Sequence, residues 1–141
     1  MAADFVVAVL STVETPFGQR PMVGTDTTSY IPVDTKEEAH YLCGLLNSSP
    51  ARAYIRSFSS AGRGFGAPSI IALLNLVSFD SSNQIHTHIS ALSDKAHQTM
   101  DGTPKSETDI VSIEADIDTS AAALWGINPA ELKTLQVAIA R

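Results

Sequence analysis

The chain has 141 residues, a length that favours one domain with a core of its own. Hydrophobic residues make up 44% of it, charged residues make up 17%, and the formal net charge at pH 7 is −6. This acidic balance argues against a domain that grips DNA by itself, because phosphate binding needs clustered lysine and arginine. No apolar run approaches the roughly 20 residues that cross a bilayer, so the sequence predicts no membrane partner.

Residues 1–34 carry the patterns of short strands. Asp4–Val13 is rich in valine, and Thr15–Gly18 has the composition of a turn. Arg20–Thr25 and Thr27–Val33 follow as two further strand candidates, the second with alternating β-branched and aromatic residues. Together these segments predict a small N-terminal sheet.

Two consecutive helices are predicted between residues 35 and 60. Thr35 and Glu38 form the T-x-x-E pattern of a capping box, in which each side chain bonds the backbone amide of the other residue. Ser49 is a suitable N-cap for the second helix, and Pro50 suits its first position because the missing N–H is not needed there. The sequence therefore predicts a helix, a tight corner and another helix.

Three arginines lie in the second helix and in the loop after it. Arg52 and Arg56 are four residues apart, so we expect them to share the solvent-facing side of the helix. Arg63 follows between Gly62 and Gly64, in a loop with high backbone freedom. Guanidinium groups match phosphate oxygens and guanine edges, so contact with DNA is one interpretation, and a solvated helix with a connector is the other.

Residues 65–141 predict a short strand followed by helices. The strand candidate is Asn75–Phe79, and helical patterns run over Ser82–Met100 and Ser106–Leu124. A final helix begins at Asn128, which is followed by proline and, at the box position, by glutamate. The predicted class is α+β, a single domain over residues 1–141, with a small N-terminal β-sheet packed on a layer of about five helices.

Three sequence words in this order carry a resemblance to a known family. They are EEAHYLCGLLNSSPARAYIRSFSS from Glu37, FDSSNQIHTHISALSDKAHQ from Phe79, and ALWGINPAEL from Ala123. The chain from about Asp4 onward resembles the C-terminal, TaqI-like specificity region of adenine-specific DNA methyltransferases of restriction–modification systems. One departure is Leu76-Val77-Ser78, where that family often has a proline-containing segment.

The resemblance implies an accessory part of a larger enzyme. The chain has neither an Asn/Asp-Pro-Pro motif nor a glycine-rich turn after a strand, so it has no catalytic residue to assign. S-adenosylmethionine is implied for a separate catalytic domain, and the implied partners are double-stranded DNA and that domain or subunit. From charge and position alone we place DNA contact at a set of five residues: Arg52, Arg56, Gly62, Arg63 and Gly64. The alternative is a protein-interaction module that docks through its acidic helices, 82–100 and 106–124.

Other reactive side chains favour structural roles. His40 and Cys43 have the spacing of metal ligands, but no second His/Cys pair completes a tetrahedral site, so we predict no metal. Glu114, Asp116 and Asp118 are interpreted as a solvated acidic helix face. The remaining histidines, and serines 57, 59 and 60, have no partners at a recognisable catalytic spacing.

The single cysteine and the single tryptophan are assigned to packing. Cys43 lies on the apolar side of a predicted helix, which favours a buried, inert thiol, and the chain can form no internal disulfide. A reducing cytoplasm is the natural compartment for such a chain. Trp125 stands at a helix end, where a large aromatic ring commonly closes a small core.

Overall fold

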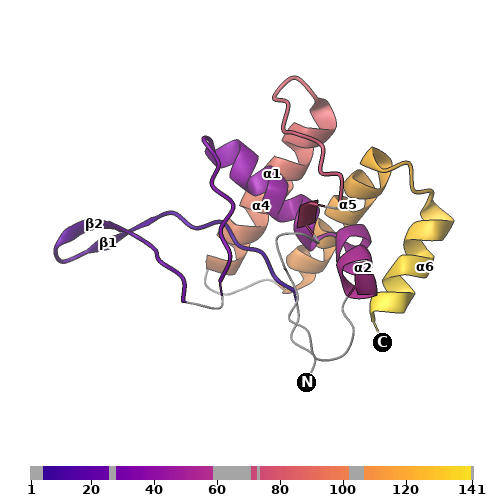
Figure 1. Cartoon of the computed structure of the whole chain (residues 1–141), viewed down its shortest axis with the longest axis horizontal. Coiled ribbons are helices and arrows are strands. Elements are labelled where there is room, and N and C mark those ends of the chain that lie inside the picture. The colour runs from indigo at the N-terminus through magenta and orange to yellow at the C-terminus, as the bar shows by residue number, and fades with distance from the viewer. Residues whose placement is uncertain (1–4, 26–27, 59–70, 73, 102–106, 141) are drawn as a thin grey trace.

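A computed structural model describes residues 5–25, 28–58, 71–72, 74–101 and 107–140. The predicted α+β class is confirmed, because the described part holds one two-stranded antiparallel sheet and five helices (Figure 1). The elements are β1 (Thr12–Thr15), β2 (Gly18–Pro21), α1 (Lys36–Asn47), α2 (Ser49–Phe58), α4 (Gln84–Asp101), α5 (Glu107–Leu124) and α6 (Pro129–Ile139).

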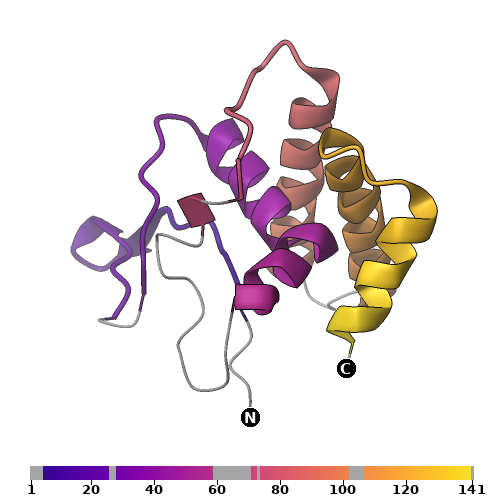
Figure 2. The ribbon, with the colours of Figure 1, turned by 45° about the vertical axis from the view of Figure 1, so that its right-hand side comes forward.

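Helix α1 is the centre of the fold. It packs along α4, α4 packs along α5, and α2 packs along α6 at the other side of the bundle (Figure 2). Tyr41 and Leu45 of α1 meet Ile89 of α4 and Ala121 of α5, and all four are fully buried. Gly44 lets the two helices approach closely, because a Cβ there would lie 2.8 Å from Cγ2 of Ile89.

A second cluster joins α2 to this centre. Its buried members are Leu46, Ala51, Ile55 and Leu74, and Trp125 packs against both clusters. The prediction that this tryptophan closes the core is therefore confirmed. Burying such large side chains is the main favourable term that orders a helical domain of this size.

The predicted helix starts at Thr35 and Asn128 are found. The Glu38 amide donates to Oγ1 of Thr35 at 3.1 Å, which is one of the two bonds of the predicted capping box. Asn128 and Glu131 form both bonds of the capping box at the start of α6. Gly126 ends α5 with a φ of 67°, a conformation that costs glycine little.

The hairpin formed by β1 and β2 stands away from the helices (Figure 1). Its register pairs Thr12 with Pro21 and Thr15 with Gly18, and Gly18 closes the turn with a φ of 91°. Within the described residues the hairpin contacts no helix, so the expected packing of the sheet on the helical layer is not found. The small sheet exists, but the helices form their core without it.

Three of the predicted strand segments were wrong in their placement. The described parts of Asp4–Val13 and Thr27–Val33 form no strand except where Thr12 and Val13 enter β1, and Asn75–Phe79 forms none. The predicted second strand, Arg20–Thr25, coincides with β2 only at its first two residues. Strand-like composition reports a fit to a half-buried pleated surface, and here no neighbouring strand provides that surface.

Side chains of α1 and α4 bind the backbone where the first strand was expected. The Asn47 amide accepts from the Val7 N–H at 3.0 Å and donates to the Val7 carbonyl at 2.7 Å. The Val9 N–H donates to Nε2 of His97 at 3.4 Å. Backbone groups must find partners when a chain leaves water, and these side chains supply them instead of a sheet.

Among the described residues, no helix is both long and apolar enough to cross a membrane.

Candidate functional site

Only two of the five residues predicted to contact DNA lie in the described part of the chain. Arg52 and Arg56 are on α2, and both are half-buried rather than fully exposed. Gly62, Arg63 and Gly64 lie outside the described residues, so their placement stays a prediction. The described residues therefore do not show whether the five predicted residues lie close together.

Arg56 holds two helices together. Its Nη1 donates to the carbonyl of Ile139 in the last turn of α6. The expectation of a solvated helix face is therefore corrected for Arg56, because this bond ties its side chain to α6, which packs along α2. The two helices are far apart in sequence, so spacing within α2 gave no sign of this contact.

The N-terminus of α2 is capped by a carboxylate from another helix. Asp118 of α5 accepts from the Ser49 N–H at 2.6 Å and from the Ser49 hydroxyl, and Nε2 of Gln136 donates to it at 2.9 Å. Asp118 is only 8% exposed. Its interpretation as part of a solvated acidic face was wrong, whereas Glu114 and Asp116 are exposed as predicted.

This carboxylate also changes the interpretation of Ser49. The helix already begins at Ser49, and the Ser48 carbonyl accepts the first helical bond, from the Arg52 N–H at 2.9 Å. The predicted N-cap is thus one residue too late. A negative group at a helix N-terminus is favoured by the unpaired N–H groups and by the helix dipole, so Asp118 does what a local cap would do.

Charge is unevenly distributed over the helices. α2 carries Arg52 and Arg56 and no acidic residue, whereas α5 carries five acidic residues and no basic one. Among the described helices, α2 is the only one whose lysines and arginines outnumber its acidic residues. Among the described helices, α2 would therefore repel an anionic group least.

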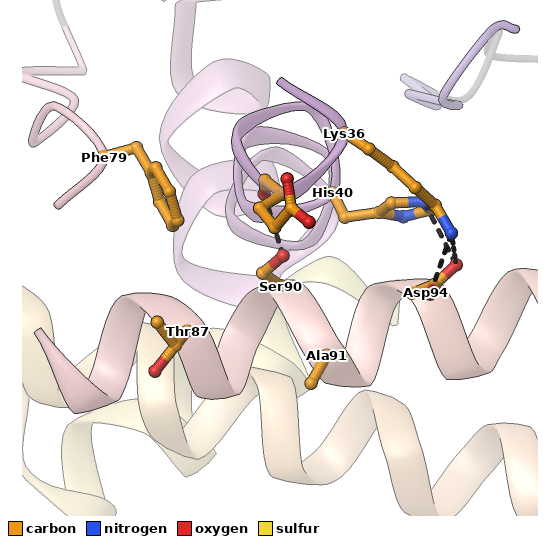
Figure 3. A pocket seen from close by; sticks show the side chains of 8 residues that line it. Lys36, His40, Phe79, Thr87, Ser90, Ala91 and Asp94 are labelled. Carbon is orange, nitrogen blue, oxygen red and sulfur yellow. Dashed lines mark hydrogen bonds and ion pairs between the residues drawn. The ribbon is translucent and has the colours of Figure 1, made fainter. Parts of the chain in front are cut away.

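A cleft lies between the first turns of α1 and the middle of α4 (Figure 3). Its volume is about 200 Å³, and its lining comes from α1, α4 and the segment before α4: Lys36, Glu37, His40, Phe79, Thr87, Ser90, Ala91 and Asp94. Ligand pockets for drug-sized molecules usually occupy about 300–1,000 Å³. The cleft therefore suits a group the size of one side chain and not a nucleoside cofactor such as S-adenosylmethionine.

An ion pair closes one end of this cleft. Nζ of Lys36 is 2.9 Å from Oδ1 of Asp94, and Nε2 of His40 is 3.3 Å from the same oxygen. The hydrogen bond from Lys36 keeps the pKa of Asp94 below its usual value, with a smaller contribution from His40. Burial lowers the pKa of His40 and outweighs the opposing effect of Asp94, so the imidazole is neutral at pH 7.

Ser93, His40 and Asp94 form a row that resembles a nucleophilic triad. Oγ of Ser93 is 3.3 Å from Nδ1 of His40. A carboxylate can only accept, so Nε2 of His40 carries the proton and Nδ1 accepts from the Ser93 hydroxyl. Ser93 is 2% exposed, so no substrate reaches its hydroxyl, and the row is a buried hydrogen-bond network.

Sequence reasoning missed this row. His40 and Ser93 are 53 residues apart, and no local spacing links them. The one available signal was that His40 and Ser93 belong to two of the words that carry the family resemblance. His97 is partly buried next to this row, and it bonds the Ser93 carbonyl at 2.8 Å.

His86 is a second buried histidine on α4. The Asp80 N–H donates to its Nδ1 at 3.1 Å, so Nε2 carries the proton, and that N–H has no partner among the described residues. Its ring lies 4.7 Å from the ring of Tyr41 and 6.4 Å from that of Phe79. These aromatic neighbours place His86 in the core.

The remaining predictions about reactive groups concern metal binding and thiol chemistry. Among the described residues, no group of three or more His, Cys, Asp or Glu side chains could hold a metal ion. Cys43 is buried as predicted, and burial raises its pKa, which keeps the thiol protonated and unreactive. Ser57 donates to the Tyr54 carbonyl at 2.6 Å, and serines 59 and 60 lie outside the described residues.

Searches against protein-family models, curated proteins and solved structures gave no match. The family resemblance therefore depends on the three sequence words alone. In the structure these words contribute α1, α2, α4 and the α5–α6 corner, which contact one another.

Proposed function

We propose that this chain is a target-recognition or spacer segment of an adenine-specific DNA methyltransferase from a restriction–modification system. In this proposal it performs no methyl transfer itself and positions a catalytic domain or subunit on double-stranded DNA. S-adenosylmethionine binds that other domain. The enzyme acts in the cytoplasm, consistent with the single buried cysteine.

One observation carries the proposal. Residues of the family-like words bond each other across helices: the Ser93 hydroxyl bonds the His40 ring, and the Ser90 hydroxyl donates to the backbone carbonyl of Glu37. These words thus specify one helical scaffold, and among its described helices only α2 carries more lysine and arginine than acidic residues. Arginine on a rigid helix is well suited to phosphate contact, because a guanidinium offers five donors in a fixed plane.

The test is fluorescence anisotropy with a labelled DNA duplex at low and at moderate salt. We expect binding that weakens with salt, and a weaker, less salt-dependent affinity for the Arg52→Ala/Arg56→Ala/Arg63→Ala variant. Each lost phosphate contact lowers the salt slope by about 0.9. The matched control is Lys36→Ala/Lys95→Ala/Lys105→Ala, which removes the same charge from outside α2 and its loop.

Because Arg56 also bonds α6, the triple variant needs a check of folding. Circular dichroism and thermal unfolding serve this purpose, and Arg56→Lys keeps the charge while removing the planar guanidinium. Equal affinity for the wild type and the folded arginine variant would contradict the role of these arginines. Affinity independent of salt would exclude phosphate contact.

A second candidate function is a protein-interaction module, and the hairpin favours it. Phe17 in its turn is 84% exposed, and its strands touch no helix in the described structure. The acidic helix α4, by contrast, is held between α1 and α5, which limits what it offers a partner. Size-exclusion chromatography with light scattering separates the two functions: a stable dimer without DNA affinity would favour the interaction module.

A further inference from the structure

We propose that the cleft between α1 and α4 is a docking site for an arginine side chain of a partner protein. The claim depends on the residues of the cleft and not on DNA binding by α2. It concerns a region that the family resemblance assigns to no ligand.

The two ends of the cleft differ in chemistry. Phe79 stands at one end and Asp94 at the other, with Ser90 between them on α4 (Figure 3). The Phe79 ring is held by Tyr41, whose ring centroid lies 5.5 Å away and which is fully buried. A fixed aromatic ring offers a surface on which a guanidinium can stack.

The charge of the lining favours a cation. Glu37 and Asp94 are acidic, Lys36 is the one permanently basic residue, and His40 is held neutral by burial. Among the described residues no side chain is bonded to the Glu37 carboxylate, which is exposed in the first turn of α1. The lining thus carries one net negative charge and an acceptor ready for a new donor.

Lys36 shows how a cation enters the cleft. Its ammonium reaches across from α1 and lies 2.9 Å from Oδ1 of Asp94. The side chain of Lys36 is 63% exposed, so this ion pair adds little to stability and is easily exchanged. An arginine would place its planar fork between Glu37 and Asp94 and its stem against Ala91 and Phe79, in competition with Lys36.

The size of the cleft agrees with this occupant. About 200 Å³ is too small for a drug-sized ligand but large enough for one long side chain. A neutral apolar side chain would leave the Glu37 and Asp94 carboxylates without a donor, and an acidic one would be repelled by them. Arginine satisfies both the apolar wall and the carboxylates.

The test uses the full chain, labelled with nitrogen-15, and a short peptide, acetyl-Gly-Arg-Gly-amide. We expect saturable amide shift changes at Glu37, Thr87, Ser90, Ala91 and Asp94. The same peptide with citrulline, which keeps the shape and removes the charge, should bind more weakly. We expect Glu37→Gln to weaken arginine-peptide binding about two- to five-fold, as for one exposed charge pair.

The variant Lys36→Met tests whether Lys36 competes with the arginine peptide for the cleft. We expect it to strengthen binding of the arginine peptide, because it removes the competing cation, whereas the control Lys95→Met, outside the cleft, changes nothing. Weaker binding in Lys36→Met would overturn the proposal, as would equal binding of the citrulline peptide or shift changes confined to other residues. None of these outcomes depends on DNA affinity, so failure here and failure of the proposed function can be told apart.

Discussion

The helical body and the hairpin are held by different kinds of contact. In the body, Tyr41 of α1 packs on residues of α4 and α5 and on the segment before α4, so each helix is fixed by others far away in sequence. In the hairpin, residues 12–21, the strands pair only with each other, and Phe17 is exposed. A two-stranded hairpin alone is at best marginally stable in water. The difference indicates that the helical body holds most of the stabilising contacts of the described chain and that the hairpin contributes few.

The largest expected difference in stability is between two variants that each lose an aromatic ring, one in the helical body and one in the hairpin. Tyr41→Ala leaves a cavity in the core and unpairs the Val77 carbonyl, to which its hydroxyl donates at 3.0 Å. We expect a loss of about 3–5 kcal/mol in the free energy of unfolding, measured by urea denaturation. Phe17→Ala, the matched change in the hairpin, should alter it by no more than about 0.5 kcal/mol. Similar losses in both variants would show that the hairpin belongs to the cooperative unit.

A smaller effect is expected where α5 caps α2. Asp118→Ala leaves the Ser49 amide and hydroxyl without their acceptor in a buried place. We expect a loss of about 2–3 kcal/mol in the free energy of unfolding, measured by urea denaturation. Asp116→Ala, two residues away and exposed, should stay within about 0.5 kcal/mol. Equal losses would mean that charge on α5, and not the cap, is what matters.

The smallest effect is a dependence of stability on pH in the body. His40 is buried and its pKa lies below the ordinary value of 6.5, so the unfolded chain takes up a proton that the folded chain refuses. As pH falls below about 6.5, the free energy of unfolding should therefore decline until the pKa of the folded state is passed. Asp94 acts in a separate pH range, because its pKa in the folded state is lowered from the ordinary value of 3.8. Its contribution to stability is therefore present above pH 3.8 and is lost only as the pH falls further.

His40→Gln provides the measurement for this last prediction. Its urea unfolding curves between pH 7 and pH 5 should give a flatter stability profile than the wild type, because an amide does not titrate there. The hairpin variant Phe17→Ala should keep the wild-type slope. An unchanged profile in His40→Gln would assign the acid sensitivity to another group.

Local chemistry determined the helices. The T-x-x-E pattern at Thr35 and the Asn-Pro start at Asn128 predicted where helices begin, because caps satisfy backbone groups within a few residues. Apolar spacing likewise predicted the two long helices over 82–100 and 106–124, which correspond to α4 and α5. Such signals need no knowledge of the rest of the chain.

Only the tertiary structure decided which polar groups meet. Asp118 looks like a surface acid until α2 brings an uncapped N-terminus to it, and Arg56 looks solvated until α6 covers it. His40, Ser93 and Asp94 come together only because α1 packs on α4. The backbone of the expected first strand bonds the side chains of Asn47 and His97 instead of another strand. Caps and apolar stripes are short-range properties of the chain, whereas the pairing of polar groups depends on how the helices pack, and no spacing in the sequence encodes that.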